Sequence, residues 1–342
     1  MGGEIRSVQE LEDRLSEPTA GVIRALGGLE GDLVVLGAGG KMGPSLSRMA
    51  RRASDAAGVK RRVIAVSRFS NAAVAAALEE NGVEPLSCDL LDEEAVARLP
   101  EAPNVVYMAG MKFGTTGNEP MTWALNAFLP GVACRRYRTS RFVVFSSGNV
   151  YGLAPVSSGG SRETDAPCPA GEYAWSVLAR ERIFQHFGAA AGTPVVLLRL
   201  NYACEMRYGV LVDIAQRVRD RRPVNLTMGW LNTIWQGDAN AMALQAFALA
   251  ATPARILNLT GPETLRVREV AEKFGRIMGR PVAFEGEEAD SALLSDSRPA
   301  HGLLGLPLVA ADTLIQWVAD WVMRGGPSLG KPTHFESRDG RF

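Results

Sequence analysis

The sequence has 342 residues, which is long enough for one large or two modest domains with an ample hydrophobic core. Its 37 Lys and Arg residues balance 37 Asp and Glu residues, and this zero formal net charge argues against a nucleic-acid-binding protein, which usually has a basic excess. No run of 18 apolar residues is present and the acidic N-terminus lacks a signal-peptide pattern, so we expect no membrane span.

The four cysteines and the three histidines are widely scattered and have neither the spacing of metal ligands nor a C-x-x-C motif. We therefore expect reduced thiols, a cytoplasmic location and no metal site.

In chain order, residues 8–29 are predicted to form one or two short helices packed outside the fold. Short apolar runs then alternate with helical stretches, a pattern typical of βαβ units and of a parallel sheet covered on both faces. The expected strands are 32–37, 62–67, 83–90, 104–110, 141–147 and 194–201. The sequence thus predicts an α/β fold with a Rossmann-type doubly wound parallel sheet.

After about residue 202 helices and short strands mix, which indicates a smaller substrate lobe at the carboxyl edge of the sheet. The expected organisation is an N-terminal helical extension (1–30), a dinucleotide-binding domain (31–202), an interleaved mixed substrate lobe (203–325) and a tail (326–342). For the polar tail two placements stay open, loose in solvent or across the site.

A glycine-rich turn follows the first expected strand and opens a helix. Gly37, Gly40 and Gly43 have the spacing G-x-x-G-x-x-G. In a strand–turn–helix context these glycines permit a tight turn, close approach of a pyrophosphate to the backbone and close helix–strand packing. We therefore expect a dinucleotide here, with Lys41 and Met42 in the same loop; the alternative is a tight turn without a ligand.

The end of the second expected strand bears on the type of dinucleotide. NAD sites usually place an acidic residue there to bind the ribose 2′-hydroxyl, but this chain has Ser67 and Arg68. Arg68 can pair with a 2′-phosphate and Lys41 can add charge, so we expect NADP in preference to NAD. Alternatively, Arg68 is a solvated surface residue.

Ser147 ends the fifth expected strand, and Tyr173 begins a helical segment in which Val177 follows four residues later. Residues at i and i+4 share one helix face, so a cation at 177 would favour the phenolate of Tyr173. Valine supplies no charge, and at pH 7 an unperturbed tyrosine is only about one part in a thousand ionised. Tyr173 is thus a weak base unless another cation, such as the nicotinamide itself, helps.

Residues 31 to about 322 resemble the extended short-chain dehydrogenases, the group of sugar-nucleotide epimerases and dehydratases. Six segments carry the resemblance: the glycine turn, "MAGMKFG", "SSGNVYG", "ETDAPCPAGEYA", "TIWQGDANAMALQA" and "LNLTGPETLRVREVA". The fourth-strand segment "MAGMKFG" is most similar to that of the UDP-galactose 4-epimerases. The chain departs from the family pattern in three places: Val177 replaces the lysine of Tyr-x-x-x-Lys, Pro130 interrupts a helix, and Asn201 and Tyr202 do not reproduce the epimerase's "R-Y-F-N-P".

The resemblance implies that Ser147 orients the substrate hydroxyl or carbonyl and that Tyr173 transfers its proton. Lys112 would lie beside the cofactor and is the candidate substitute cation. Further cofactor contacts implied by the same motifs are Asp89, Leu90, Ala109 and Gly110; Asp89 is alternatively only a turn former. Candidate substrate contacts are Asn149, Asn201, Arg207 and Trp235, although Trp230 and Trp235 fit core packing better.

Two functions remain open from the sequence. The first is an NAD(P)-dependent oxidoreductase or epimerase acting on a sugar, a sugar acid or a sugar nucleotide. The second, suggested by Val177, is a catalytically inactive NAD(P)-binding sensor or partner protein. The resemblance also implies a homodimer formed through 124–137 and 173–184.

Overall fold

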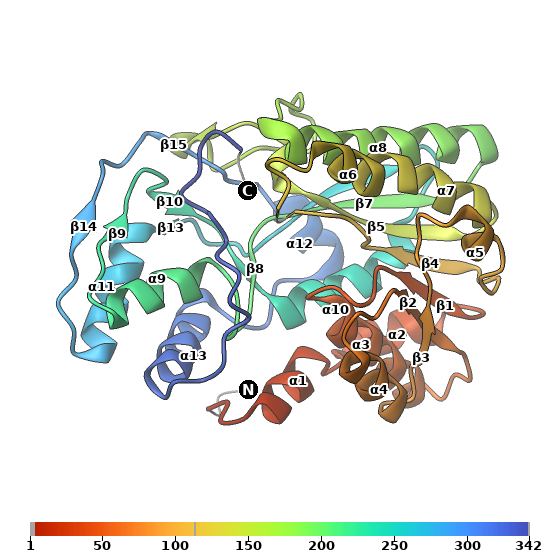
Figure 1. Ribbon diagram of the computed structural model, residues 1–342, viewed down its shortest axis with the longest axis horizontal. Helices are drawn as coiled ribbons and strands as arrows, with labels where there is room; N and C mark the ends of the chain where they lie inside the picture. The colour runs from red at the N-terminus through yellow and green to blue at the C-terminus, as the bar shows by residue number, and fades with distance from the viewer. Residues whose placement is uncertain (1–3, 113, 341–342) are drawn as a thin grey trace.

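The computed structural model describes residues 4–112 and 114–340. Its centre is a parallel sheet with the strand order β12-β7-β5-β4-β1-β2-β3 (Figure 1). The strands are β1 (Leu33–Leu36), β2 (Val63–Ser67), β3 (Glu84–Ser87), β4 (Asn104–Tyr107), β5 (Arg141–Ser147), β7 (Val195–Leu200) and β12 (Arg255–Leu259). The predicted doubly wound fold is confirmed, and β12 adds an edge strand that the sequence did not predict.

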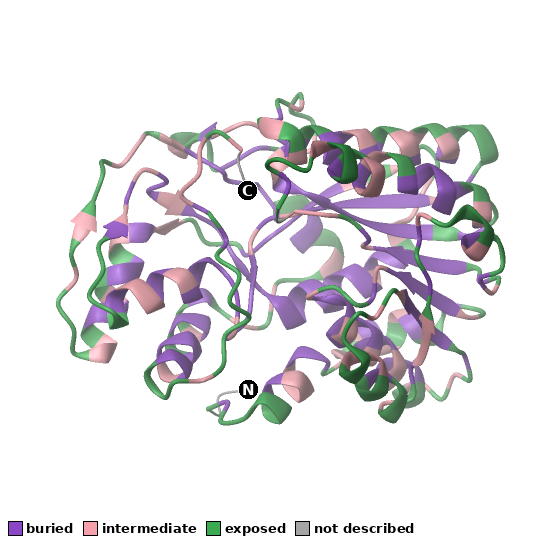
Figure 2. Cartoon of the chain, viewed as in Figure 1, coloured by how far each residue is buried: buried purple, intermediate pink, exposed green. Residues whose placement is uncertain are grey.

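The apolar composition of the strands explains why the sheet lies in the middle of the molecule. Every residue of β1 and β4 is buried, as expected for strands that are covered on both faces (Figure 2). β1 pairs in parallel with β2 on one side and with β4 on the other. Chain order therefore reverses at β1 and β4, and a ligand crevice forms at such a reversal, beyond the carboxyl ends of the strands.

Helices cover both faces of the sheet (Figure 1). The helices α6 (Glu119–Trp123), α7 (Leu129–Arg136) and α8 (Gly171–Ala191) lie on one face, together with the π-helical turn η1 (Ala124–Phe128). Pro130 lies in the first turn of α7, directly after the π-helical turn η1, and the helical backbone runs on through it from α6. On the other face lie α2 (Ala20–Gly27), α3 (Gly43–Ala56) and α10 (Gln236–Gln245). The remaining elements of this domain are α4 (Ala72–Glu80), α5 (Glu93–Ala97), η2 (Gly148–Val150), η3 (Val156–Ser158), η4 (Ala246–Leu249) and α12 (Arg298–Leu304).

The smaller lobe has its own core around three helices, α9 (Val210–Arg219), α11 (Val267–Met278) and α13 (Ala311–Met323). Short strands pair around it: β6 (Ala154–Pro155) with β15 (Ser291–Ala292), β8 (Ala203–Cys204) with β11 (Ile234–Trp235), β9 (Val224–Asn225) with β14 (Phe284–Glu285), and β10 (Trp230–Leu231) with β13 (Leu265–Arg266). Within the described residues no helix is long and apolar enough to cross a membrane.

The N-terminal helices differ from expectation. α1 (Val8–Leu15) buries Leu11 and Leu15 in the lobe core, and α2 buries Val22 and Leu26 in the core beneath the sheet. The expectation that they pack outside the fold is therefore wrong, because their apolar faces complete the surfaces of α3 and α10.

The tail lies across the molecule rather than loose in solvent (Figure 1). The Leu329 N–H donates to the Arg207 carbonyl at 3.0 Å, and the Thr333 N–H donates to Asp213 Oδ2 at 2.8 Å. Further along, the Gly340 backbone lies against that of Gly171, where α8 begins. The tail thus bridges the lobe and the domain that carries α8.

Candidate functional site

The glycine turn joins β1 to α3 at the reversal of the sheet. Gly37 has φ +88°, and a Cβ there would lie 2.5 Å from the Ala109 nitrogen, so both conformation and space require glycine. A Cβ at Gly43 would meet the Ala38 carbonyl. At Gly40, in contrast, an added Cβ would meet only the Gly37 oxygen at 3.4 Å. The protein itself scarcely requires a glycine at position 40, so the residue fits a site where a ligand approaches the backbone.

A cavity of about 280 Å³ opens on one side of this turn. It contains eight of the residues predicted to contact the cofactor: Gly37, Gly40, Ser67, Arg68, Asp89, Leu90, Ala109 and Gly110. Exposed Arg68 lies at the end of β2, and the carboxylate of Asp89 accepts a hydrogen bond from the Leu91 N–H at 3.1 Å. These residues fit the adenosine half of a dinucleotide, and Asp89 also acts as the turn former considered as the alternative.

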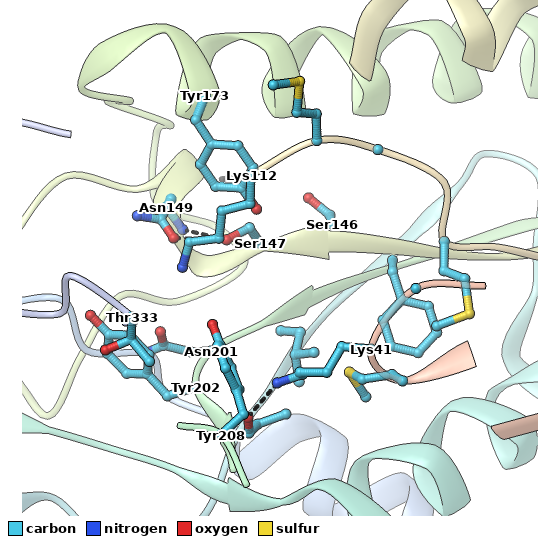
Figure 3. A pocket seen from close by; sticks show the side chains of 18 of the residues that line it. Lys41, Lys112, Ser146, Ser147, Asn149, Tyr173, Asn201, Tyr202, Tyr208 and Thr333 are labelled. Carbon is cyan, nitrogen blue, oxygen red and sulfur yellow. Dashed lines mark hydrogen bonds between the residues drawn. The ribbon is translucent and has the colours of Figure 1, made fainter. Parts of the chain in front are cut away.

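A second cavity, of about 370 Å³, lies on the other side of the turn, and Gly37, Gly40 and Gly110 line both cavities. Ser147 and Tyr173 line the second one (Figure 3). Ser147 reaches it from the carboxyl end of β5 and Tyr173 from the first turn of α8. Residues far apart in the sequence are thus brought together next to the glycine turn.

Ser147 and Tyr173 are coupled to each other and to their surroundings. The Ser147 hydroxyl donates to Asn149 Oδ1 at 2.9 Å. Burial raises the pKa of Tyr173, whereas the charge of Arg180 and a hydrogen bond with Ser147 lower it. Burial has the larger effect, so Tyr173 is protonated at neutral pH in this state and is poised as a proton donor.

Val177 lies one helical turn beyond Tyr173 and is fully buried among Val150, Tyr151 and Leu178. Tyr151, which belongs to the same sequence motif as Ser147, does not reach the cavity. Its hydroxyl donates to Asn258 Oδ1 at 2.9 Å and accepts a hydrogen bond from Arg199 at 2.6 Å. This surrounding is closed and apolar on the side of Val177, so the chain has replaced the expected lysine with a packing residue.

Lys112, the candidate substitute cation, follows β4 and points into the cavity (Figure 3). Its ammonium lies 5.8 Å from the centroid of the Tyr173 ring. Burial lowers the pKa of Lys112 to about 8, so this group is charged in most molecules at pH 7.

Arg180 is a second cation near Tyr173 that the sequence analysis missed. It lies seven residues after Tyr173 on α8, is buried, and lines the same cavity. Its guanidinium donates to the Phe145 carbonyl at 2.8 Å and to Asn126 Oδ1 at 2.7 Å. A Cβ at Gly110 would collide with the guanidinium, so that glycine makes room for it. The sequence signal that could have identified Arg180 was its spacing of two helical turns from Tyr173.

Asn126 connects Arg180 to the loop that carries Lys112. Its side chain is fully buried in the π-helical turn η1, a type of irregularity that is frequent at functional sites. The amide accepts from the Met111 N–H at 2.9 Å and donates to the Met111 carbonyl at 2.8 Å and to Ser176 Oγ at 3.0 Å. This network fixes the loop after β4 against α8.

Lys41 lies elsewhere than predicted. Its ammonium donates to the Ala203 carbonyl at 3.1 Å and lies 3.6 Å from the centroid of the Tyr208 ring, on the side of the lobe (Figure 3). It lines the second cavity and not the one beside Arg68, so the expected contact of Lys41 with a 2′-phosphate is corrected. Burial lowers the pKa of Lys41 to about 7.

The remaining predicted residues divide into two groups. Met42, Asn149 and Asn201 line the second cavity, and buried Gly43 packs at the start of α3. Arg207 instead pairs with Glu205 and Glu12, and Trp235 packs edge-on against Trp317 with ring centroids 5.6 Å apart. The structure does not bring Arg207 or Trp235 to the cavity, because ion pairing and core packing hold them in the lobe.

The further cavity residues that were not predicted as contacts include Tyr202, Tyr208, Lys331 and Thr333. The first two come from the segment between β7 and α9, and the other two from the tail. Polar character alone did not single them out, because their position depends on how the lobe and the tail close over the sheet.

Comparisons with known proteins agree with this geometry. A family model described as the NAD dependent epimerase/dehydratase family matches residues 33–204. The search of curated proteins found no match. The structure is similar to MoeE5 in complex with UDP-glucuronic acid and NAD, with 21% identity, 86% of this chain and 99% of the other covered, and a TM-score of 0.68.

Two further solved structures show the same likeness over 86% of this chain and 99% of theirs. The NAD complex of UDP-glucuronic acid 4-epimerase from Bacillus cereus has 16% identity and a TM-score of 0.70. The NAD complex of UDP-glucose 4-epimerase from Thermus thermophilus has 21% identity and a TM-score of 0.68. At these identities the likeness establishes the shared fold.

Proposed function

Because the chain belongs to the NAD-dependent epimerase/dehydratase family, we propose that it is an NAD(P)-dependent oxidoreductase or epimerase that acts on a hydroxyl group of a carbohydrate. One observation carries the proposal. Ser147 and Tyr173 face the same cavity, which continues past Gly40 into the one beside Arg68. A dinucleotide laid along the glycine turn would extend from Arg68 to Tyr173.

Each residue of the site would have a separate role in the reaction. The nicotinamide, when bound, accepts or supplies the hydride. Tyr173 gives or takes the hydroxyl proton, and Ser147 orients the oxygen that carries it. Arg180 and Lys112 provide positive charge near Tyr173 in place of the lysine that Val177 replaces. Arg180 is the permanent member of this pair because a guanidinium stays protonated in proteins.

We propose NADP(H) as the preferred cofactor. Only residues of this chain support this preference, since the named neighbours are complexes with NAD. Ser67 and Arg68 line the cavity where an acidic residue would bind a ribose 2′-hydroxyl, and Arg68 can pair with a 2′-phosphate. Calorimetry of the wild type and of Arg68→Asp tests this. The Arg68→Asp exchange should reverse the preference for NADP(H) over NAD(H). Tighter binding of NAD(H) than of NADP(H) by the wild type would refute the proposed preference.

A catalytically inactive dinucleotide-binding protein is the second candidate. The buried Val177 favours it, because a valine brings no amine to Tyr173. The presence of both Ser147 and Tyr173 on one cavity favours the enzyme, because a protein without proton transfer has no need of that pair.

Turnover of a panel of sugars, uronates, sugar lactones and sugar nucleotides separates the two candidates. For an accepted substrate, Tyr173→Phe should lower kcat by about 10²–10⁴-fold, the usual contribution of a positioned proton-transfer group, with cofactor affinity retained. Tight cofactor binding without turnover of any member, in the wild type and in Tyr173→Phe alike, would favour the binding protein.

We also propose a homodimer formed through α6, η1 and α8. Large apolar side chains on these elements are exposed in the single chain: Met121, Trp123, Phe128 and Trp175. Such a patch is typical of an interaction surface.

A further inference from the structure

The cavity beside Tyr173 is strongly cationic. Lys41, Lys112, Lys331 and Arg180 line it, and its described lining includes no Asp or Glu. The whole sequence has five lysines and no net charge, yet three of the five lie here. Chance placement of surface charge does not account for such a concentration, because lysine is otherwise rare in this chain.

The three lysines come from separate parts of the chain and surround the cavity. Lys41 belongs to the glycine turn and Lys112 to the loop after β4, and their ammonium groups point into the space from opposite walls (Figure 3). Lys331 lies on the tail, where the Leu329 and Thr333 hydrogen bonds hold the backbone against the lobe. The fold of the tail therefore adds the third charge.

This arrangement carries an electrostatic cost in the absence of a ligand. Burial lowers the pKa of both Lys41 and Lys112, and the charge of Lys112 further disfavours the charged form of Lys41. The Glu205 carboxylate favours the charged form of Lys41 and the Asp213 carboxylate that of Lys112, but neither lines the cavity: Glu205 pairs with Arg207 at 3.0 Å, and Asp213 accepts from Thr333 Oγ1 at 2.6 Å. A bound anion would offset the repulsion, whereas a neutral ligand would not.

The phosphates of the cofactor do not by themselves explain these charges. A pyrophosphate at the glycine turn is served by backbone N–H groups and the N-terminus of α3. The Lys41 ammonium is directed toward Ala203 and Tyr208 of the lobe, and Lys331 lies on the tail, beyond the glycine turn. With a dinucleotide along the glycine turn, the three lysines would surround the space left for a substrate.

The volume of the cavity limits the size of that substrate. Its 370 Å³ is near the lower end of the ~300–1,000 Å³ range of small-molecule sites, and it must also hold the nicotinamide end of the cofactor. This space favours a single sugar ring over a sugar with an attached nucleotide.

We propose that the substrate is an anionic monosaccharide whose carboxylate or phosphate is bound by Lys41, Lys112 and Lys331. This inference rests on the proposed function and narrows it. Charge-assisted hydrogen bonds to the anion would hold the ring in one orientation, with a hydroxyl directed to Ser147 and Tyr173.

The test is calorimetry and turnover with cofactor-saturated protein. The probes are D-galacturonate, D-galactose, a galactose phosphate and UDP-galactose. We expect the acid or the phosphate to bind at least tenfold more tightly than galactose, and the stronger of the two identifies the anion. Three variants, Lys41→Met, Lys112→Met and Lys331→Met, should each weaken the binding of that probe about tenfold. This corresponds to a loss of ~1.4 kcal/mol in binding free energy. Lys331→Glu, at an exposed position that tolerates the change, should weaken the binding further.

Lys60→Met is the matched control, because Lys60 is exposed and does not line the cavity. Cofactor affinity is measured for every variant, so that loss of cofactor is not taken for loss of the anion. Equal binding of acid and neutral sugar, no effect of the lysine variants, or tightest binding of UDP-galactose would overturn the inference. Anion binding without any turnover would overturn the proposed function and keep only the anion site, whereas equal turnover of neutral and anionic sugars would keep the proposed function and overturn the inference.

Discussion

At the scale of single residues, Val177 is the most consequential departure from the family pattern. Its side chain is fully buried in an apolar cluster with Val150 and Leu178. A lysine there would accelerate proton transfer only if its ammonium stayed charged. In this surrounding it would instead lose its proton or destabilise the fold.

We therefore expect Val177→Lys to lower the free energy of unfolding by about 2–4 kcal/mol, the range for a buried group without a partner. Urea denaturation measures the change, and Val177→Met, which has a long apolar side chain, is the control. If Val177→Lys is as stable as Val177→Met and turns over faster, the position is open to a charge and our account of Val177 fails.

Gly40 gives a second prediction at this scale. Its neighbours leave space for a Cβ, so Gly40→Val should fold, but the branched side chain would occupy the place of the pyrophosphate and abolish dinucleotide binding. Fluorescence titration with NAD(P)H measures binding. Gly302→Val is the control, because no atom lies within 4 Å of a Cβ added at Gly302. Retained binding by Gly40→Val would mean that the cofactor lies elsewhere.

Single residues were predictable where a local motif fixes them. Ser147, Tyr173 and the glycines belong to short segments, and the structure places them around connected cavities. The direction of Lys41 was not predictable, because it depends on the Ala203 carbonyl, which is 162 residues away in the chain.

At the scale of secondary-structure elements, α8 is central to the candidate site. It carries Tyr173 in its first turn and Arg180 two turns later, and Arg180 ties it to β5 and to η1. The sequence predicted the helix and the tyrosine. It could not show that Arg180 lies inward, because that depends on the space at Gly110 and on the π-helical turn around Asn126.

The charge of Arg180 lowers the pKa of Tyr173. Arg180→Met removes this effect, so the pKa of Tyr173 should rise, and the alkaline limb at which the tyrosine ionises should move to higher pH. In the direction that needs the phenolate, kcat at pH 7 should fall by up to about 10-fold for each unit by which the pKa rises.

Measurement of kcat as a function of pH tests this prediction, and Arg180→Lys should partly restore the wild-type profile. Lys112→Met is the companion variant, because Lys112 lies 5.8 Å from the Tyr173 ring centroid. An unchanged profile in Arg180→Met, together with a shifted one in Lys112→Met, would assign the substitute charge to Lys112 alone.

The N-terminal helices show why packing partners are harder to predict than elements. Residues 8–29 have the amphipathic pattern of surface helices, and two helices form there. The pattern does not identify what covers the apolar face. In the structure Asn240 of α10 donates to the Leu15 carbonyl at 3.3 Å, a contact between residues 225 positions apart.

At the scale of the whole molecule, alternation of apolar strands with helices was enough to predict the doubly wound sheet. The additional strand β12 was not predicted, because it follows the lobe segment in the chain and returns to pair with β7. The closure of lobe and tail over the cavity likewise depends on contacts such as Thr333 with Asp213, which no local pattern encodes.

The prediction for the whole molecule concerns the formation of a dimer. The exposed side chains of Trp175 on α8 and Phe128 on η1 should be buried between two copies of the chain, so the wild type should be a dimer in solution. Light scattering after size-exclusion chromatography measures the mass. Trp175→Arg should yield monomers, whereas Leu306→Arg, at a 65% exposed residue outside these helices, should leave the dimer intact. A monomeric wild type, or dimers of Trp175→Arg, would contradict the assignment.

The central claim is that a dinucleotide lies along the glycine turn with its nicotinamide beside Tyr173. A crystal structure with bound NADP tests this most directly. The account predicts the pyrophosphate at Gly37–Gly43, the 2′-phosphate beside Arg68, and the nicotinamide in the cavity of Ser147, Tyr173 and Lys112. Density for the dinucleotide at another place, or a nicotinamide ring directed away from Tyr173, would contradict it.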